Sequence, residues 1–347
     1  MNTKLDLTIL KKIIEIESLS IKPVQTFNAL RLIKQKLLSL KIPVQIINRQ
    51  TFPVLIAGNL SNANNLFLSH IDVVPGNKNQ FIFKQNGDKI FGRGSLDMKG
   101  PLIVSLTTFI FLWQKKIQNN IFVVTSDEEI GGFNGIPVII NKFLKEIRSA
   151  IILDSSSNEK IVLIQKAPFH IKIVSKGRSS HGSKPWEGVN SVENICKCSL
   201  NIVNAINKNS KTETSAAITQ LYGGTATNVI PDKASSTIDI RIKNKKEIPE
   251  IVRLIDKLTK KQNCKWLRID EPLFVNIPKN NEFINKWSNN IEFTVESGTS
   301  DARFLSEKNI PILITSASGN GAHTDNEWVS KSSLERLQNN LIKFLLE

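Results

Sequence analysis

The 347-residue sequence is poor in cysteine, in aromatic residues and in long apolar runs, and each shortage excludes a class of protein. Its three cysteines form no even-numbered disulfide framework, and none has metal-ligand spacing to a histidine. No run of about eighteen apolar residues predicts a membrane span, and the longest apolar segment, 101–113, is expected to be a buried helix. The N-terminus lacks the features of a signal peptide. We therefore expect a cytoplasmic protein.

The chain has a large excess of positive charge. There are 46 basic and 31 acidic residues, which gives a net charge of +15. Such a balance is typical of proteins that bind nucleic acid or anionic membranes. The basic residues are spread along the chain, however, and the few aromatic residues, 7%, are not interleaved with them as in single-strand binders. We expect neither nucleic acid nor membrane as a partner, whereas a small anionic substrate is compatible with this charge.

Hydrophobic periodicity predicts an alternation of helices and short strands in the first half of the chain. The expected helices cover 6–17, 25–41, about 100–115 and 134–146, and the expected strands cover 43–48, 53–58, 65–70, 120–125 and 149–153. Such an order is typical of a doubly wound α/β domain with a central sheet.

From about residue 168 the pattern changes to βαββαβ, the ferredoxin-like arrangement. Its expected elements are strand 169–176, helix 189–206, strands 214–222 and 235–242, helix 247–261 and strand 265–270. We predict one domain formed by 1–166 and 278–347 and an inserted domain formed by 167–277.

Five short segments carry residues that divalent metal ions bind, and the first four each follow an apolar run. They are 66–72 (LFLSHID), 92–100 (GRGSLDMKG), 123–129 (VVTSDEE), 151–154 (IILD) and 322–325 (AHTD). Ligands of open α/β sheets gather at the carboxyl ends of strands, so these segments can converge in one crevice. For the last segment to join them, the expected strands 291–295 and 312–314 and the helix from Ser300 should return to the first sheet.

Each of these residues also has an ordinary structural explanation. A lone histidine after an apolar strand, as at His70, is more often structural, and Asp97 in a Gly-rich loop is typical of turn chemistry. The chain has only four histidines, however, and both His70 and His323 have an acidic residue two positions further on. Zinc accepts histidine, aspartate and glutamate as ligands. A metal site is the favoured interpretation.

Four segments resemble the motifs of the zinc-dependent aminoacylase and carboxypeptidase family, which includes succinyl-diaminopimelate desuccinylase and acetylornithine deacetylase. They are 69–75 (SHIDVVP), 92–100, 125–129 (TSDEE) and 297–301 (SGTSD). The resemblance implies a hydrolase with two Zn²⁺, or Co²⁺ or Mn²⁺ as substitutes, that cleaves the amide bond of an N-acyl amino acid. Succinyl-diaminopimelate desuccinylase is the best-known match. A dipeptidase or aminopeptidase acting on a short peptide is the alternative, and a non-catalytic binding protein is a rival from another class.

The resemblance also implies a ligand set for two metal ions. The ligands would be His70 and Asp154 for one ion, Glu129 and His323 for the other, and Asp97 for both. A shared carboxylate keeps two cations about 3.5–4 Å apart, where a water between them has a pKa of about 7. An aspartate such as Asp154 is more typical of the dipeptidase and aminopeptidase branches than of the desuccinylases, which usually have glutamate. Glu159 is therefore the second choice.

The resemblance also implies catalytic roles for three further residues. Glu128 is the general base that takes a proton from the water and delivers it to the leaving amine. Asp72 accepts the second N–H group of His70 and fixes its tautomer. His181 reaches the active site of a second subunit and stabilises the oxyanion, so the inserted domain would be a lid and the homodimer the catalytic unit. A solvated acid at Glu128 and a polar turn at His181 are the alternatives, and His170 is expected to be structural.

The resemblance implies a substrate clamp as well. Arg241 would bind a substrate carboxylate with two parallel hydrogen bonds, and Asn228 would donate to the scissile carbonyl. Gly298 and Thr299 form a turn into a helix N-terminus, whose free N–H groups also suit a carboxylate. A solvent-facing role would explain Arg241, and helix capping would explain the residues that follow Thr299.

Overall fold

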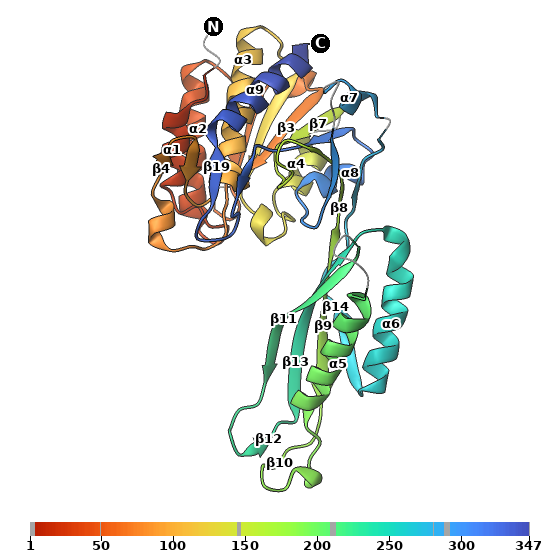
Figure 1. The fold of residues 1–347 in the computed structure, drawn as a ribbon. Coiled ribbons are helices and arrows are strands. Elements are labelled where there is room, and N and C mark those ends of the chain that lie inside the picture. The colour runs from red at the N-terminus through yellow and green to blue at the C-terminus, as the bar shows by residue number, and fades with distance from the viewer. Residues whose placement is uncertain are drawn as a thin grey trace. The chain divides into compact units, whose positions relative to one another are not determined.

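The computed structural model describes residues 4–48, 50–143, 147–208, 213–279, 281–287 and 292–346. The chain forms two compact units (Figure 1). The first comprises Met1–Leu163, Asn276–Glu296 and Ser300–Glu347, and the second comprises Ile164–Val275 and Ser297–Thr299. Each unit has its own sheet and its own core and is described by itself.

A six-stranded mixed sheet forms the centre of the first unit, in the order β1-β2-β6-β3-β7-β17. The strands are β1 (Val44–Ile47), β2 (Val54–Gly58), β3 (Asn65–His70), β6 (Asn120–Thr125), β7 (Ser149–Ile152) and β17 (Ile312–Ile314). Strands β6, β3, β7 and β17 are parallel, whereas β1 and β2 are antiparallel to their neighbours. Strands β2, β6 and β7 are buried along their whole length, as expected for a sheet covered on both faces. The predicted α/β fold is confirmed.

Most helices of this unit form where the sequence predicts them, but the C-terminal helix at 331–346 was not predicted. They are α1 (Leu7–Ile14), α2 (Pro23–Ser39), α3 (Gly100–Gln114), α4 (Ile136–Phe143), α7 (Glu282–Asn285), α8 (Ala302–Ser306) and α9 (Lys331–Leu346). The carboxylate of Asp6 caps α1 by accepting the N–H of Ile9 at 3.1 Å. The end of the predicted helix 134–146, residues 144–146, lies outside the described residues.

Helix α3 is the apolar core helix of the first unit. Among the described residues, Ser95–Gln114 is the one helical stretch long and apolar enough to cross a membrane, and 83% of its apolar window is buried. It packs on β3, β6 and α9. The segment predicted to be a buried helix, 101–113, is therefore part of the core.

Two smaller sheets were not predicted. One has the order β15-β8-β16 and consists of β15 (Val275–Asn276), β8 (Ile161–Gln165) and β16 (Phe293–Glu296). The expectation that strand 291–295 returns to the central sheet is therefore wrong, and Ile291 lies outside the described residues. The physical reason is the burial pattern of the strand. Three of the four residues of β16 are partly or fully exposed, whereas strands β2, β6 and β7 of the central sheet are buried along their whole length.

The second small sheet joins the C-terminal part of the chain to the segment before α3. Its order is β18-β19-β5-β4, with β18 (Gly319–Asn320), β19 (Trp328–Ser330), β5 (Lys89–Phe91) and β4 (Lys84–Asn86). Trp328 is paired with Phe91 in antiparallel register. This pairing brings residues 319–330 beside the loop that begins at Gly92.

The second unit has the predicted βαββαβ order. Its elements are β9 (Ala167–Lys176), α5 (Ser191–Ile206), β11 (Ser215–Gly223), β13 (Lys233–Ile242), α6 (Ile248–Lys261) and β14 (Cys264–Arg268), with a short pair β10 (Ser180–His181) and β12 (Val229–Ile230). The antiparallel sheet has the order β11-β13-β9-β14, which is the ferredoxin-like order. Alternate residues of β9 and β13 are buried, and α5 and α6 cover the same face of the sheet (Figure 1).

His170 has a structural position in this sheet, as predicted. Its Nε2 lies 3.4 Å from Asp239 Oδ1 on the neighbouring strand, and its Nδ1 contacts the carboxylate of Asp270. The hydrogen bonds with Asp239 and Asp270 raise the pKa of His170 to about 9, although burial opposes this. The protonated ring therefore joins β9, β13 and the segment after β14.

We expect this histidine to make stability depend on pH. Its folded pKa is above the unfolded value of about 6.5, so its stabilising effect is complete below pH 6.5 and is lost as the pH rises through about 9. The variant His170→Gln has no such titration. The difference in Tm between the wild type and His170→Gln should shrink as the pH rises through that window. A difference that stays constant would contradict the assignment.

Candidate metal centre

The five predicted ligand residues come from five separate segments of the first unit. His70 ends β3, Asp154 follows β7, and Glu129 lies in the turn Glu128–Ile130 that follows β6. These three strands are parallel neighbours, so their carboxyl ends meet at one edge of the sheet. Asp97 lies in the loop before α3, and His323 lies between β18 and β19.

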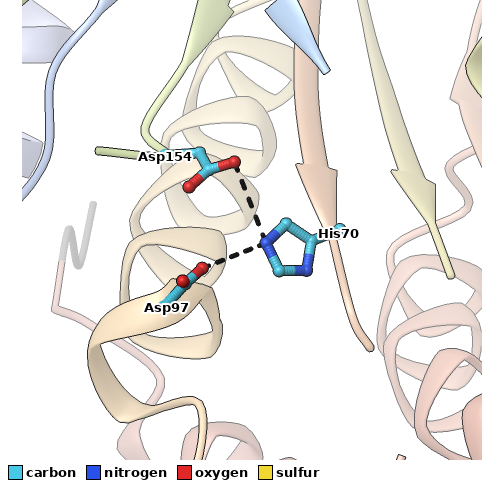
Figure 2. A group of neighbouring side chains, drawn as sticks. All are labelled: His70, Asp97 and Asp154. Carbon is cyan, nitrogen blue, oxygen red and sulfur yellow. Dashed lines mark hydrogen bonds and ion pairs between the residues drawn. The ribbon is translucent and has the colours of Figure 1, made fainter. Parts of the chain in front are cut away.

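The side chains form two groups that share Asp97. In the first, His70 Nε2 lies 3.2 Å from Asp97 Oδ1 and 3.8 Å from Asp154 Oδ2, and both carboxylates point toward the ring (Figure 2). In the second, His323 Nε2 lies 3.1 Å from Asp97 Oδ2 and 3.2 Å from Glu129 Oε2. Within each group the ligand atoms all lie within 4.8 Å of one another. Each oxygen of Asp97 thus faces a different histidine.

The donor set fits divalent metal ions. Each group offers one imidazole nitrogen and two carboxylate oxygens, the ligands that zinc and related ions accept. The second oxygen of Glu129, Oε1, is buried and has no hydrogen-bond partner among the residues that the structure describes. Buried carboxylates need a compensating positive charge, because an unpaired buried charge is costly. A pair of cations would supply that charge.

The electrostatics of the metal-free site show the same need. Burial raises the pKa of Asp154 well above its usual range, and the negative charge of Asp97 adds to this. Burial also opposes ionisation of Asp97, but hydrogen bonds from His323 and His70 outweigh it and hold its pKa below the usual range. The hydrogen bonds with Asp97 and Glu129 raise the pKa of His323 to about 10. Protonated imidazoles therefore balance the carboxylates when metal is absent.

Asp72 organises the turn that carries Glu128 and Glu129. Its side chain is fully buried and accepts the N–H of Glu128 at 3.3 Å, the N–H of Glu129 at 3.1 Å and the hydroxyl of Ser20 at 2.6 Å. The Nδ1 of His70 lies 3.0 Å from the backbone oxygen of Asp72 and 3.4 Å from its Oδ1. The nearest acceptor for the second imidazole N–H is thus the carbonyl, and either contact leaves Nε2 free for a metal.

Glu128 belongs to neither group, but it is near enough to His70, Asp154 and Glu129 for their charges to shift its pKa. Burial raises the pKa of its carboxyl well above the usual range; the charge of His70 opposes this, and the charges of Asp154 and Asp301 reinforce it. A carboxylate with raised proton affinity next to a metal pair can take a proton and return it.

The two candidates for the third carboxylate ligand lie in different environments. Asp154 is in the His70 group, whereas Glu159 accepts hydrogen bonds from Arg336 Nη2 at 2.7 Å and from Ser318 Oγ at 3.1 Å. Glu159 is therefore engaged away from the other ligands. Sequence reasoning missed Glu296, which accepts the N–H of Ser156 at 2.6 Å and so holds the loop after Asp154.

The other predicted site residues belong to the second unit. The Nδ1 of His181 on β10 contacts Ser183 Oγ at 2.8 Å, and the His181 side chain is exposed. Arg241 donates from Nε and Nη2 to Asp239 Oδ2 at 3.1 and 2.9 Å, so its guanidinium has a partner two residues away. Asn228 is exposed next to β12, and Gly298 and Thr299 lie between β16 and α8. Their roles stay predictions.

Comparisons with known proteins agree with the resemblance seen in the motifs. The profile of peptidase family M20/M25/M40 matches residues 66–347. Over 327 residues, 83% of this chain and 82% of the relative, the sequence is 27% identical to succinyl-diaminopimelate desuccinylase of Rickettsia bellii. Over 284 residues, 78% of this chain and 77% of the relative, it is 31% identical to the LysW-lysine/LysW-ornithine hydrolase of Sulfurisphaera tokodaii.

The fold also has a close counterpart among solved structures. The crystal structure of a tripeptidase from Staphylococcus aureus superposes with a TM-score of 0.79 and covers 99% of this chain and 98% of that chain. The two sequences are 19% identical, so this likeness concerns the fold alone.

Proposed function

The chain belongs to peptidase family M20/M25/M40, and on that premise we propose that it is a two-zinc hydrolase that cleaves the amide bond of an N-acyl amino acid. The observation that supports this most is the pair of ligand groups joined by Asp97. Succinyl-diaminopimelate is the substrate we favour, since a relative that spans most of the chain is named for its desuccinylation. Co²⁺ or Mn²⁺ would substitute for Zn²⁺.

The proposed mechanism assigns the proton transfers to Glu128. Metal ions held by the five ligands would supply the Lewis acidity that lowers the pKa of a water and polarises the scissile carbonyl. Glu128 takes a proton from the attacking water and later delivers it to the leaving amine. Asp72 keeps Glu128 in place through the backbone N–H of that residue. The buried surroundings of Glu128 raise its pKa, which suits a group that must both accept and release a proton.

The second unit supplies the proposed substrate contacts. Arg241 binds a substrate carboxylate, in competition with Asp239, and Asn228 donates to the scissile carbonyl. His181 of a second copy of the chain stabilises the oxyanion, so we propose a homodimer in which this unit acts as lid and dimerisation domain. We also propose a cytoplasmic location, which agrees with three cysteines that form no disulfide.

A second candidate function is a dipeptidase or aminopeptidase with the same metal chemistry. It is favoured by one observation: the residue in the His70 group is Asp154 and not a glutamate. The two candidates differ in the substrate and share the catalytic residues.

An activity assay of the zinc-loaded chain separates the candidates. We expect kcat/KM for succinyl-diaminopimelate to exceed the values for acetylornithine and for a dipeptide panel by at least about 100-fold, since a site with polar groups for a substrate carboxylate rejects analogues that leave those groups unpaired. Removing the metal with a chelator should abolish the activity, and adding Zn²⁺ back should restore it. Highest activity on dipeptides would instead establish the second candidate. No activity on any of them after zinc loading would contradict both.

A further inference from the structure

The loop that carries Asp97 is held by a buried carboxylate outside the ligand groups. Glu327 lies four residues beyond His323, and its side chain is 1% exposed. Its Oε2 accepts the N–H of Gly94 at 3.0 Å. Its Oε1 accepts the N–H of Leu96 at 3.0 Å and the N–H of Asp97 at 3.2 Å. One carboxylate thus receives three backbone donors of the loop, one of them from the shared ligand itself.

Arg93 ties the same loop to the segment that carries His323. Its Nη1 donates to Glu327 Oε2 at 2.9 Å and to the backbone oxygen of Thr324 at 3.1 Å. The side chain of Gln80 donates to that same oxygen at 2.9 Å. Thr324 directly follows His323, so these contacts hold the backbone next to each of the two ligands. The guanidinium and the carboxylate are both almost completely buried.

A buried ion pair of this kind adds little net stability, because desolvation of the two charges offsets their attraction. The pair instead constrains geometry, because the Glu327 carboxylate and the Arg93 guanidinium can satisfy all their hydrogen-bond partners in only a few arrangements. Here those partners are backbone groups of two segments that lie more than 220 residues apart in the sequence, as the separation of 233 between Gly94 and Glu327 shows.

We propose that Glu327, together with Arg93, is a positioning residue that sets the distance between Asp97 and His323 and so assembles the half of the metal centre that Glu129 completes. The inference rests on the proposed function in one respect, that two metal ions bind.

The two halves should depend on Glu327 unequally. In the half formed with His70 and Asp154, those two ligands come from β3 and the end of β7, which are paired directly in the central sheet. In that half, Asp97 is the one ligand whose position depends on Glu327. In the other half, both Asp97 and His323 lie on segments that Glu327 and Arg93 hold together.

The test measures metal binding in chains that keep one half at a time. The variant Asp154→Ala leaves the half with His323, and the variant Glu129→Ala leaves the half with His70. Glu327→Gln is added to each, because glutamine keeps the size of the side chain but turns an N–H₂ group toward backbone donors. Titration of metal-free protein with Zn²⁺ alone should give a loss of affinity of about 10–100-fold in the first background. The loss in the second background should be at least about tenfold smaller.

Equal losses in the two backgrounds, or no loss in either, would overturn the inference. Glu335→Gln is the matched control, because the carboxylate of Glu335 pairs with Lys331 at 3.2 Å on the surface of α9; it should leave both affinities unchanged. Circular dichroism and the Tm of each metal-free chain establish that it is folded. If Glu327→Gln does not fold, Arg93→Lys provides the test, since lysine keeps the charge beside Glu327 without the fork, and the same inequality is expected.

Failure of this inference is distinct from failure of the proposed function. A wild-type chain that does not bind two Zn²⁺ contradicts the proposed function. If the wild-type chain binds two Zn²⁺ but Glu327→Gln lowers the Zn²⁺ affinity equally in the two backgrounds, or in neither, only the positioning role is contradicted.

Discussion

Replacing Glu128 by glutamine is expected to lower kcat by about 10²–10⁴-fold while the chain still binds two metal ions. Glutamine has nearly the same size as glutamate but cannot take a proton from a water. The Glu128 carboxylate is in neither ligand group, so the change leaves the donors of the metal ions intact. The measurement is kcat together with the metal content of the purified variant.

The neighbouring glutamate is the matched comparison. Glu129 Oε2 lies 3.2 Å from His323 Nε2 in the second group, so Glu129→Gln should lose one metal ion as well as activity. Glu15→Gln, on the exposed end of α1, should change neither. Activity retained in Glu128→Gln would refute the assignment of the base. Loss of metal in that variant would show that Glu128 is a ligand.

The variant Asp97→Ala is expected to lose both metal ions. Its two oxygens face His70 at 3.2 Å and His323 at 3.1 Å, so removing the carboxylate takes one ligand from each group. Without the ions the barrier rises by several kcal/mol, which corresponds to a loss of at least about 10³-fold in kcat/KM. The measurement is the number of zinc ions that remain after dialysis against metal-free buffer.

Single-group variants give the comparison for this result. Asp154→Ala and His323→Ala each remove a residue of one group, so each should retain one ion of the two. If Asp97→Ala still holds two ions, or loses no more than Asp154→Ala does, the residue is not shared between two metals.

The sequence predicts the central sheet well, and it predicts which side chains gather at the edge of that sheet, because both signals are local. A run such as residues 66–69 is apolar enough to be a buried strand, and the polar residue that ends it, His70, lies at the carboxyl edge where ligands gather. Strand β16 shows the limit of this approach. Its residues have strand propensity, but propensity does not state which strand is the partner, and β16 pairs with β8 outside the central sheet.

Unlike Asp72, the supporting residues Glu296 and Glu327 could not be predicted in this way. Glu327 acts by accepting backbone N–H groups, and a backbone N–H leaves no trace in the sequence. The choice between Asp154 and Glu159 was also open, because both acids follow β7 within a few residues. The structure separates them: Asp154 faces His70, whereas Glu159 is bound to Arg336.

The central claim is that folding brings two histidines and three acids around a pair of cations. Diffraction from zinc-loaded crystals at the zinc absorption edge tests it directly. We predict two anomalous peaks about 3.5–4 Å apart, with Asp97 between them, His70 and Asp154 on one side and Glu129 and His323 on the other. A single peak, or two peaks of which neither contacts Asp97, would contradict the claim.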